Sequence, residues 1–439
     1  MTKKIKRLIL LELNEINFEV VKKYIAADPT RFNALNKLLA GPQILTTCEK
    51  LYEELEPWIQ WASVHTCKTF SEHGVFRLGD MVGSSVSQIF EELEQAGYKV
   101  GAISPMNTEN RLTKPAYFIP DPWTQTSADT SWWSQSLSQA VSQIVNDNSK
   151  SRITAKSALL VVLCVLRFAK AKHYYKYLSL VAASRRKPWQ KALVLDLLLH
   201  DVHWTMFSAN KPNFSTLFLN AGAHIQHHFF FNAEPIRKNS PYKNPEWYVK
   251  KDEDPLADVL GLYDMIVGEY FARLDTDVLL ATGLSQKPYE SVKFYYRLNA
   301  HSKFLLGLGI EFSSVLPRMS REFLIEFETE HQALAAQKIL SNVRVGEEDA
   351  PLFGEIDNRG DSLFVTLTYP REITSSTQYR VNALKAKLLP EVSFVAIKNG
   401  MHQEEGYAFF SPGIAKYAPT NKTHVAQLGV TIKAYFDVA

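Results

Sequence analysis

The chain has few cysteines and no long hydrophobic run. Its three cysteines, Cys48, Cys67 and Cys164, are scattered and odd in number, which excludes a disulfide framework and a cysteine-based zinc motif. The longest strongly apolar stretch, residues 158–166, is far shorter than the roughly 20 residues that a membrane-spanning helix needs. The basic N-terminus leads into an apolar run that Glu12 interrupts, so it predicts a first strand and not an export signal. We therefore expect a cytoplasmic chain that does not span a membrane.

Acidic residues are absent from residues 148–195. Aromatic side chains such as Tyr174, Tyr175 and Trp189 are interleaved there with basic ones, namely Lys150, Arg152, Lys156, Arg167, Lys170, Lys172, Lys176, Arg185, Arg186, Lys187 and Lys191. A helical segment of this kind suits an anionic membrane surface or a polyanionic substrate. It also fits an ordinary solvated helical insertion, and both interpretations stay open. We expect no nucleic-acid partner.

Apolar runs alternate with helical periodicity along most of the chain. With 439 residues, 46% of them hydrophobic, it can bury a large core. Residues 7–13 are a continuous apolar run typical of a central parallel strand, and residues 98–104 and 277–284 add further strands. Pro57 fits the first turn of a helix. The pattern predicts an α/β fold with a mostly parallel sheet flanked by helices.

Two segments interrupt this alternation. One is the mostly helical segment that contains the basic region, and the other has a β-α-β-β order with a hairpin around Asn358-Arg359-Gly360. We expect the main sheet to resume at residues 392–398. The predicted organisation is an α/β core of residues 1–131, 208–285 and 393–439, a basic helical insertion of residues 132–207, and a small α+β insertion of residues 286–392.

Three histidines follow an apolar run in residues 217–231, LFLNAGAHIQHHFFF. The run reads as a buried strand, and the small residues after it allow a close turn that leaves His224, His227 and His228 at the carboxyl end of the strand. Ligands bind at that end in open α/β sheets. Neutral imidazole is also a common ligand of zinc-like metals, although single rings of this kind are often core histidines bonded to backbone.

Four segments together resemble the alkaline phosphatase superfamily, in particular its type I phosphodiesterase and nucleotide pyrophosphatase branch. They are LLELNEINFEVV at the start, TCKTFSEHGV with Lys68 and His73, FLNAGAHIQHHFFF, and NGMHQEEGYAFFSPGIAKYAPT with His402. The resemblance implies an alkaline-phosphatase-like α/β fold. It also implies two divalent metals held by Asp and His, and a Thr or Ser nucleophile at the start of a helix.

The chain departs from this pattern at several of the implied positions. The first metal-binding Asp corresponds to Asn14, the nucleophile to Pro57 or Trp58, and the Asp of the histidine segment to Ala223. In the family a metal-binding His follows that Asp by four residues, and it corresponds to His227 here. If the alignment is shifted by three residues, this pair becomes Asn220 and His224. The Asp-His pair after the second strand corresponds to residues 283–284, Gly-Leu. Ser63, Thr66 and Cys67 are the remaining candidate nucleophiles.

These departures favour fewer metal ions than the family norm, because two close cations need several carboxylates to offset their repulsion. One divalent ion, Zn or Mn, remains possible on His227, His402 and Asn14 or Glu15, with His224 as the alternative histidine. Glu15 could be a ligand or a general base, or simply cap the following helix. We take Glu15 and His228 as catalytic candidates, and Lys68, His73 and Asn220 as substrate-binding candidates.

The hypothesis that follows is a phosphodiesterase-like or phosphotransferase-like enzyme. Its substrate would be a small-molecule or glycan phosphate, in envelope or capsular glycan metabolism near a membrane surface. One alternative is a binding or scaffold protein that keeps the fold without the chemistry. Another is glycosyl transfer at the same pocket, using Glu15 and the histidines without a metal.

Overall fold

The computed structural model describes residues 5–146, 154–318 and 321–439. The chain forms two compact units. The larger comprises the described residues of Met1–Pro241, Pro245–Pro288 and Gly400–Ala439, and the smaller comprises those of Tyr242–Asn244 and Tyr289–Asn399.

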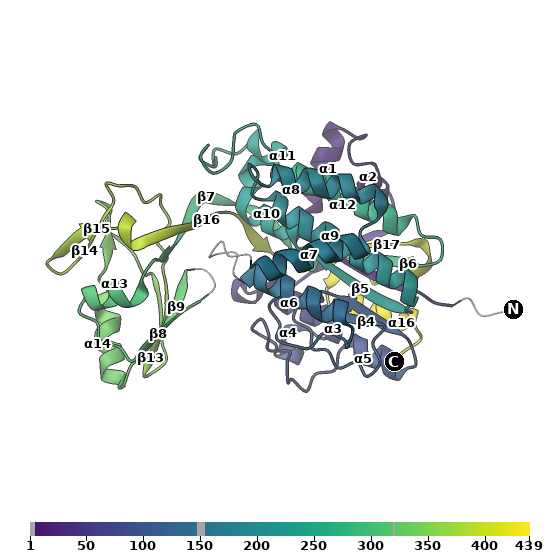
Figure 1. The fold of residues 1–439 in the computed structure, drawn as a ribbon, viewed down its shortest axis with the longest axis horizontal. Coiled ribbons are helices and arrows are strands. Elements are labelled where there is room, and N and C mark those ends of the chain that lie inside the picture. The colour runs from purple at the N-terminus through teal and green to yellow at the C-terminus, as the bar shows by residue number, and fades with distance from the viewer. Residues whose placement is uncertain (1–4, 147–153, 319–320) are drawn as a thin grey trace. The chain divides into compact units, whose positions relative to one another are not determined.

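The larger unit is built on one eight-stranded sheet with the order β18-β2-β17-β6-β1-β5-β3-β4 (Figure 1). β1 pairs in parallel with β5 and β6, and β3 pairs in parallel with β5 and β4, while β17 is antiparallel to β2 and β6. The predicted fold class, a mostly parallel sheet flanked by helices, is confirmed. The strands are β1 Leu8–Leu13, β2 Gln43–Thr47, β3 Val100–Ile103, β4 Tyr117–Ile119, β5 Phe214–Leu219, β6 Asp277–Ala281, β17 Glu405–Phe410 and β18 Thr423–His424.

Helices cover both faces of this sheet because the central strands are apolar on both sides. All six residues of β1 are buried, and its odd positions Ile9, Leu11 and Leu13 belong to a different core cluster from Leu8 and Leu10. The first cluster packs against α1 Phe18–Ala27, α2 Asn33–Leu39, α9 Gln190–Asn210, α10 Ala221–Phe229 and α12 Pro255–Phe271. The second packs against α3 Pro57–Thr66, α5 Ile89–Gln95 and α16 Gln427–Tyr435.

The remaining helices of this unit are short or belong to the basic region. The short ones are α4 Phe70–His73, α11 Glu234–Arg237 and α15 Pro412–Ala415, with 3-10 turns η1 Tyr52–Glu54, η3 Ala171–His173 and η4 Phe230–Asn232. The basic region contains α6 Trp132–Asn146, α7 Ala155–Phe168 and α8 Tyr174–Ala183. Together with α9, these helices make most of the described part of residues 132–207 helical, as the sequence predicts.

The smaller unit carries the predicted β-α-β-β order. It consists of β9 Glu322–Glu326, α14 Glu330–Ser341, and the hairpin of β12 Glu355–Asn358 and β13 Ser362–Thr366. These strands form the sheet β12-β13-β9-β8, and a second sheet has the order β11-β10-β14-β15. The other elements are α13 His301–Gly307, β8 Ser314–Pro317, β10 Arg344–Val345, β11 Ala350–Pro351, β14 Gln378–Val381, β15 Leu384–Lys387 and η5 Leu389–Glu391.

One expectation about the return to the core is wrong. Residues 392–398 do not resume the main sheet, because β16 Val392–Gln403 pairs with β7 Ser285–Leu298 in a separate two-stranded sheet. The strand that rejoins the eight-stranded sheet is β17, which begins one residue after β16, beyond a bend at Glu404. An apolar alternating run predicts a strand, but it does not say which partner the strand takes.

A mostly buried ion-pair network joins the basic region to the rest of the larger unit. Glu269 of α12 is bonded by Lys170 and Lys172, and it lies 2.8 Å from His200 and 3.2 Å from His173. Asp201 lies 2.7 Å from His173 Nδ1 and accepts a 3.0 Å hydrogen bond from the Tyr177 hydroxyl. The network thus joins η3, α8, α9 and α12.

Protonation of His173, which contacts Asp201 and Glu269, makes the stability of this network depend on pH. Burial opposes the charged imidazole, but the hydrogen bonds to Asp201 and Glu269 outweigh it and raise the pKa of His173 above 6.5. Burial likewise opposes the Glu269 carboxylate, but bonds to the histidines and lysines lower its pKa below 4.5. The His173 contribution is complete below the unfolded-state pKa and is lost as pH rises through the folded value, whereas that of Glu269 is lost on acidification.

We therefore expect His173→Gln to lower the free energy of unfolding by about 2 kcal/mol at about pH 5.5 and by less at about pH 9. Urea unfolding at the two pH values measures the difference. His331→Gln, at an exposed position on α14, is the control. A loss for His173→Gln that is the same at both pH values would contradict the assignment of a charged imidazole.

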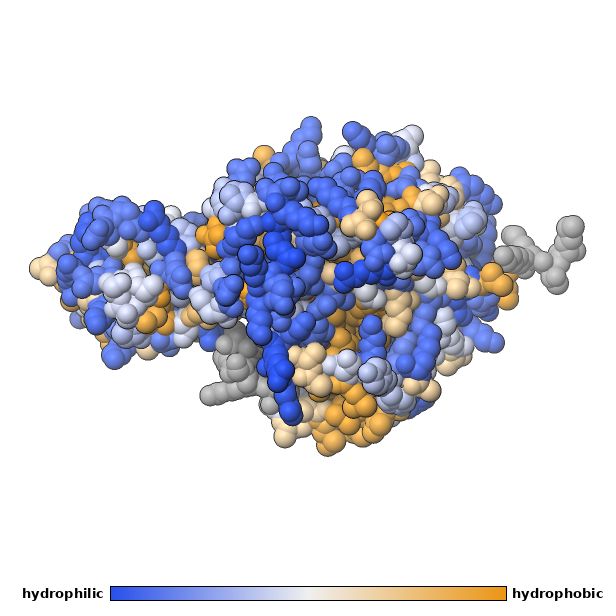
Figure 2. Space-filling view, turned by 90° about the horizontal axis from the view of Figure 1, so that it is seen from above, coloured by the Kyte–Doolittle hydropathy of each residue, from blue (hydrophilic) through white to orange (hydrophobic). Residues whose placement is uncertain are grey.

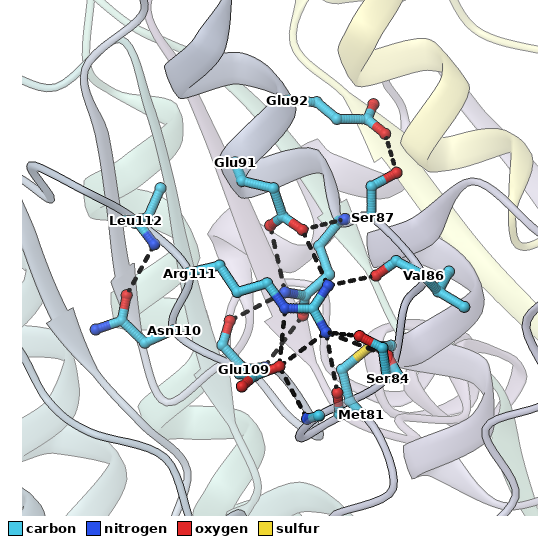
Figure 3. Close-up of polar contacts among 12 residues, drawn as sticks. Met81, Ser84, Val86, Ser87, Glu91, Glu92, Glu109, Asn110, Arg111 and Leu112 are labelled. Carbon is cyan, nitrogen blue, oxygen red and sulfur yellow. Dashed lines mark hydrogen bonds and ion pairs between the residues drawn. The ribbon is translucent and has the colours of Figure 1, made fainter.

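Arg111 holds together the two loops that follow α4 and β3. Its guanidinium donates to the carbonyls of Val86 at 2.7 Å and Ser84 at 2.6 Å, and to the carboxylate of Glu109 at 2.8 Å (Figure 3). A further bond goes to the Met81 carbonyl at 3.2 Å. These bonds fix the loop that begins at residue 105 against the loop that follows α4.

Arg111→Ala should lower the free energy of unfolding by about 2 kcal/mol, because it leaves several carbonyls and a carboxylate without their donor. Arg111→Lys should recover only part of that loss, since an ammonium lacks the planar fork. Denaturant titration measures both variants against Arg31→Ala, which removes an exposed arginine. Equal midpoints for Arg111→Ala and Arg31→Ala would show that the loop does not depend on this side chain.

Candidate metal site

The site begins where β1 ends. Asn14 donates its backbone N–H to the Leu219 carbonyl of β5, and Glu15 donates its own to the Thr282 carbonyl after β6, at 3.1 and 3.0 Å. Glu15 has φ +60°, a left-handed conformation that a residue with a side chain adopts at a cost. The helix that follows is capped by Asn17, whose side chain accepts from Val20 N–H. Glu15 is therefore free of the capping role.

Three side chains from distant parts of the sequence converge at this point. Glu15 Oε2 lies 3.0 Å from His227 Nε2 and 3.1 Å from His402 Nε2, and the two Nε2 atoms are 3.2 Å apart. Glu15 follows β1, His227 belongs to α10, and His402 belongs to β16. The Glu15 side chain is 3% exposed, while those of His227 and His402 are 19% and 12% exposed, so the site is closed on the carboxylate side and reaches solvent at the imidazoles.

The outer ring nitrogens have partners that orient the inner ones. His227 Nδ1 lies 3.1 Å from the Gly400 carbonyl, an acceptor, so Nδ1 carries a hydrogen. Nε2 faces Glu15, to which it donates when it is protonated, and it would present a lone pair to a metal only after it loses that proton. His402 Nδ1 lies 3.6 Å from a carboxylate oxygen of Glu56, the residue before α3. His227 therefore has the arrangement of a metal-ligating histidine, whose far nitrogen donates to a carbonyl or carboxylate, whereas the contact of His402 with Glu56 is an ion-pair distance and not a hydrogen bond.

The charge of Glu15 depends on these rings. Burial alone would raise the pKa of its carboxyl, but His402 and His227 outweigh burial and hold the pKa well below 4.5. The Gln286 side chain adds a 2.5 Å hydrogen bond to Oε2. A buried carboxylate stays ionised only with such compensation, so Glu15 presents an anionic oxygen at neutral pH.

The histidine segment differs in one respect from the expectation. The strand β5 is present, but α10 begins directly after it, so the three histidines lie on a helix and not on a turn. Gly222 packs closely there: a Cβ would lie 2.3 Å from Ile16 Cδ1 and 3.0 Å from Tyr263 Cε2, so a larger residue would displace these side chains. His227 enters the cluster, whereas His224 and His228 pack against each other with ring centroids 4.7 Å apart.

Asn14 and Asn220 lie beside the cluster. The Asn14 amide donates to Glu15 Oε1 at 3.0 Å and to Asn220 Oδ1 at 2.8 Å, and its own oxygen accepts from the Trp61 indole at 2.8 Å. The oxygen that a cation would need is therefore bonded to Trp61. In this geometry Asn14 orients Glu15, and its side-chain oxygen is not offered to a cation beside the two imidazoles.

Lys68 and His73 lie at the other end of α3 from Glu56. Lys68 is exposed, and His73 is buried with Nε2 3.0 Å from Ser63 Oγ and Nδ1 accepting from Val75 N–H. Burial lowers the pKa of His73 to about 4, so its imidazole is neutral at pH 7. Within the described residues, His73 is not grouped with Glu15, His227 and His402.

Two of the candidate nucleophiles, Ser63 and Thr66, are buried, and Cys67 is partly buried. Ser63 and Thr66 donate to the carbonyls one turn earlier in α3, and burial raises the pKa of the Cys67 thiol to about 12. Glu56 and Pro57 occupy the start of α3, so that position carries no hydroxyl.

Sequence reasoning did not identify several residues that shape the site. Gln226 donates to the Glu15 carbonyl at 2.7 Å, and Gln286 donates to the Glu15 carboxylate and to the Ala223 carbonyl. Asp196 of α9 accepts from Ala221 N–H at 2.9 Å and so caps α10 from another helix. Burial raises the pKa of Asp196 to about 6. Only the position of Gln286, just after β6 at the same sheet edge, was a signal in the sequence.

A second group, His173, His200 and Asp201, has the same residue types. It is less suited to a cation, because the Lys170 ammonium is bonded to Glu269, which in turn contacts both imidazoles. The charges of that group are already balanced by protein cations.

The geometry of the first cluster fits one divalent ion. Ligand atoms about 2.0–2.1 Å from a tetrahedral zinc lie roughly 3.3–3.4 Å apart, close to the separations of 3.0, 3.1 and 3.2 Å seen here. Two imidazole nitrogens and one carboxylate oxygen are a donor set used for zinc and for other first-row metals. Three ligands leave a position open for water or substrate.

We expect the purified protein to bind about one equivalent of Zn²⁺ or Mn²⁺, and His227→Ala and His402→Ala each to weaken binding by more than about hundredfold. Binding should weaken below about pH 6, because protons compete for the imidazoles. Calorimetry with metal-free protein measures both effects, and His331→Ala is the matched control. Unchanged affinity in the two cluster variants would place the bound ion elsewhere.

Comparisons with known proteins give similarity at the level of whole structures. No protein-family model matches the chain, and no curated protein is significantly similar to it in sequence. Among solved structures, phosphonoacetate hydrolase from Sinorhizobium meliloti 1021 matches at 10% identity and a TM-score of 0.45, covering 98% of this chain and 96% of that one.

Two further matches come from other organisms. Murine ectonucleotide pyrophosphatase/phosphodiesterase 5 matches at 10% identity over 99% of this chain and 95% of its own, with a TM-score of 0.42. Alkaline phosphatase from the Antarctic bacterium TAB5 matches at 9% identity over the full length of both chains, with a TM-score of 0.38. These are members of the superfamily that the sequence motifs resemble. The likeness concerns the fold, and the chemistry of the site rests on this chain's own residues.

Proposed function

We propose that this protein acts on phosphate esters, as a hydrolase or a phosphotransferase, with one divalent cation held by Glu15, His227 and His402. The observation that carries the proposal is the convergence of one carboxylate oxygen and two imidazole nitrogens within 3.2 Å of one another. They meet beside the ends of β1 and β5, the edge of an α/β sheet at which ligands bind. The sequence motifs that resemble the alkaline phosphatase superfamily support phosphate chemistry.

The number of ions follows from the donors. The carboxylate of Glu15 supplies one negative charge, and the neutral Asn14 stands where the resemblance places an Asp. Since the Asn14 oxygen accepts from Trp61, a second cation would lack an anionic ligand beside the first. The proposed site therefore holds one Zn or Mn, fewer than the family norm.

A cation bound here would polarise a phosphoryl oxygen and offset the negative charge of the phosphate. The protein residues supply orientation and proton transfer. Gly400 and Glu56 hold the two imidazoles with their inner nitrogens toward the site, and Gln286 and Asn14 hold the Glu15 carboxylate. Asn220, bonded to Asn14, is the proposed contact for a substrate hydroxyl or phosphate oxygen.

The residue at the start of α3 affects which group can attack the phosphate. Because Pro57 offers no hydroxyl there, we propose attack by water, or by a hydroxyl of a second substrate, and not a covalent enzyme intermediate. One P–O bond forms to the attacking oxygen and the bond to the alcohol breaks, with the proton passing to the leaving oxygen. His228, whose ring centroid is 6.4 Å from that of His227, is the proposed proton carrier. The substrate would be a small-molecule or glycan phosphate.

A second candidate is a binding protein that keeps the site without turnover. The observation that favours it is the combination of Pro57 and Asn14 at the positions of the implied nucleophile and metal carboxylate. In that case the cluster would bind metal and phosphate, and the bound ester would remain intact.

Turnover of aryl phosphate monoesters and diesters by metal-loaded protein tests the two candidates. We expect Glu15→Gln, His227→Ala and His402→Ala to lower kcat/KM by more than about hundredfold, and His331→Ala to change it less than about twofold. His228→Asn should lower kcat by about 10²–10⁴-fold while metal affinity is kept. Metal-loaded protein that binds phosphate without turning over either ester would support the binding protein instead.

A further inference from the structure

We propose that α7 and α8 form a docking face for an anionic lipid bilayer. The face consists of the outward side chains of Ala155–Phe168 and Tyr174–Ala183, and it is separate from the candidate metal site. Both helices belong to the larger unit and bury their inner side chains in the same core cluster as α9 (Figure 1).

The outer stripe of α7 is apolar where a solvated helix would be polar. Its inner side chains, Leu160, Cys164 and Phe168, are buried, as expected for a helix that packs on a core. On the opposite side Leu159, Val162 and Leu166 are 59%, 53% and 63% exposed. Positions 159, 162 and 166 follow helical spacing and lie on one side. The exposed residues thus form a continuous stripe and are not scattered.

α8 repeats this arrangement. Tyr177 and Leu180 are buried, while Tyr175, Leu178 and Val181 are 82%, 71% and 55% exposed. Single exposed apolar side chains are normal, but contiguous apolar surface marks an interaction site. Figure 2 shows hydrophobic atoms, in orange, gathered on the larger unit along the lower edge of that view.

The charges on this face are of one sign. No Asp or Glu occurs between residues 148 and 195. Lys170 and Lys172 are bonded to Glu269, and Lys187 lies 3.9 Å from Glu253, so these three are directed toward acidic groups of the protein, although Lys172 stays largely exposed. The exposed basic residues of the described part of the region are Lys156, Arg167, Lys172, Arg185, Arg186 and Lys191. Exposed leucine and tyrosine bordered by lysine and arginine is the composition of helices that lie in the interface of an anionic membrane.

The helices are held in place from beneath. His173, between α7 and α8, contacts Asp201 and Glu269, and Tyr177 donates to Asp201. The apolar stripe is therefore presented by helices whose inner faces are already packed, so turning it inward would break this network. None of the described helices is long and apolar enough to cross a bilayer, which makes the proposed contact a peripheral one.

Flotation with lipid vesicles tests the face. Full-length protein should float with phosphatidylcholine vesicles that contain about 30 mol% phosphatidylglycerol, and at least about tenfold less with phosphatidylcholine alone. Leu166→Ser/Leu178→Ser should reduce binding to the anionic vesicles by at least about tenfold, because it removes two inserted side chains. Arg185→Glu/Arg186→Glu should do the same, and salt should weaken the wild-type binding.

Matched controls separate the face from general surface properties. Leu274→Ser removes a leucine that is 95% exposed outside the face, and Lys22→Glu/Lys23→Glu reverses two exposed charges on α1. Both should float as the wild type does. Circular dichroism and unfolding midpoints equal to the wild type confirm that the α7 and α8 variants are folded, as expected for exposed positions.

Three results would overturn the proposal. The first is no flotation of the wild type with anionic vesicles at low salt, and the second is equal flotation with neutral ones. The third is a wild-type dimer in light scattering that Leu166→Ser/Leu178→Ser converts to monomer, since the stripe would then be a contact between two copies of this chain.

Discussion

A single buried carboxylate organises the candidate site. Glu15 is almost fully enclosed, and an ionised carboxylate in such a place needs cationic or hydrogen-bonding partners. His227 and His402 supply them from segments that are far apart in sequence, and Gln286 and Asn14 complete the shell. The left-handed backbone at Glu15 is a local cost that the surrounding contacts must offset. Strain and buried charge at the same residue are typical of a site kept for function.

Several parts of the larger unit hold the side chains of this site in position. Asp196 caps α10 from α9 and so fixes the helix that carries His227. Gly400 is favoured because a Cβ there would lie 2.8 Å from the backbone carbonyl oxygen of Gln226, and the Gly400 carbonyl holds the hydrogen of His227 on Nδ1. The positions after β1, β5 and β6 meet at one sheet edge because those strands are parallel and in register. The fold thus brings together groups that the chain keeps apart.

Another carboxylate near β1 shows how position decides role. Glu12 lies three residues before Glu15, but it points to the α3 layer, where it is bonded by Thr216 and lies 3.2 Å from His65. Both Glu12 and His65 are inaccessible to solvent. This pair therefore lies in the interior of the unit, while Glu15, beyond the end of the strand, faces two imidazoles that reach the surface. Two glutamates three residues apart therefore have different roles, because Glu12 lies within the strand and Glu15 lies beyond its end.

Much of the architecture could be predicted from the sequence. Continuous apolar runs such as β1 and β5 indicate buried parallel strands, because both faces are covered by helices. The helical spacing of the region around α7 and α8, and the β-α-β-β order of the smaller unit, are likewise local patterns. The partner of β16 was not predictable, since pairing depends on which edge is available and not on the strand's own alternation.

For the site, the sequence by itself determined the inventory: a carboxylate after the first strand, a histidine-rich segment, a late histidine, and neutral residues where the resemblance implies acids. Only the tertiary structure decided which of three neighbouring histidines takes part. His227 turns toward Glu15 while His224 and His228 pack on each other, because a helix directs residues at successive positions to different sides. It also decided that Lys68 and His73 lie elsewhere, since a helix of ten residues separates the two ends of α3. Direction in space is a property of packed elements, and no linear spacing contains it.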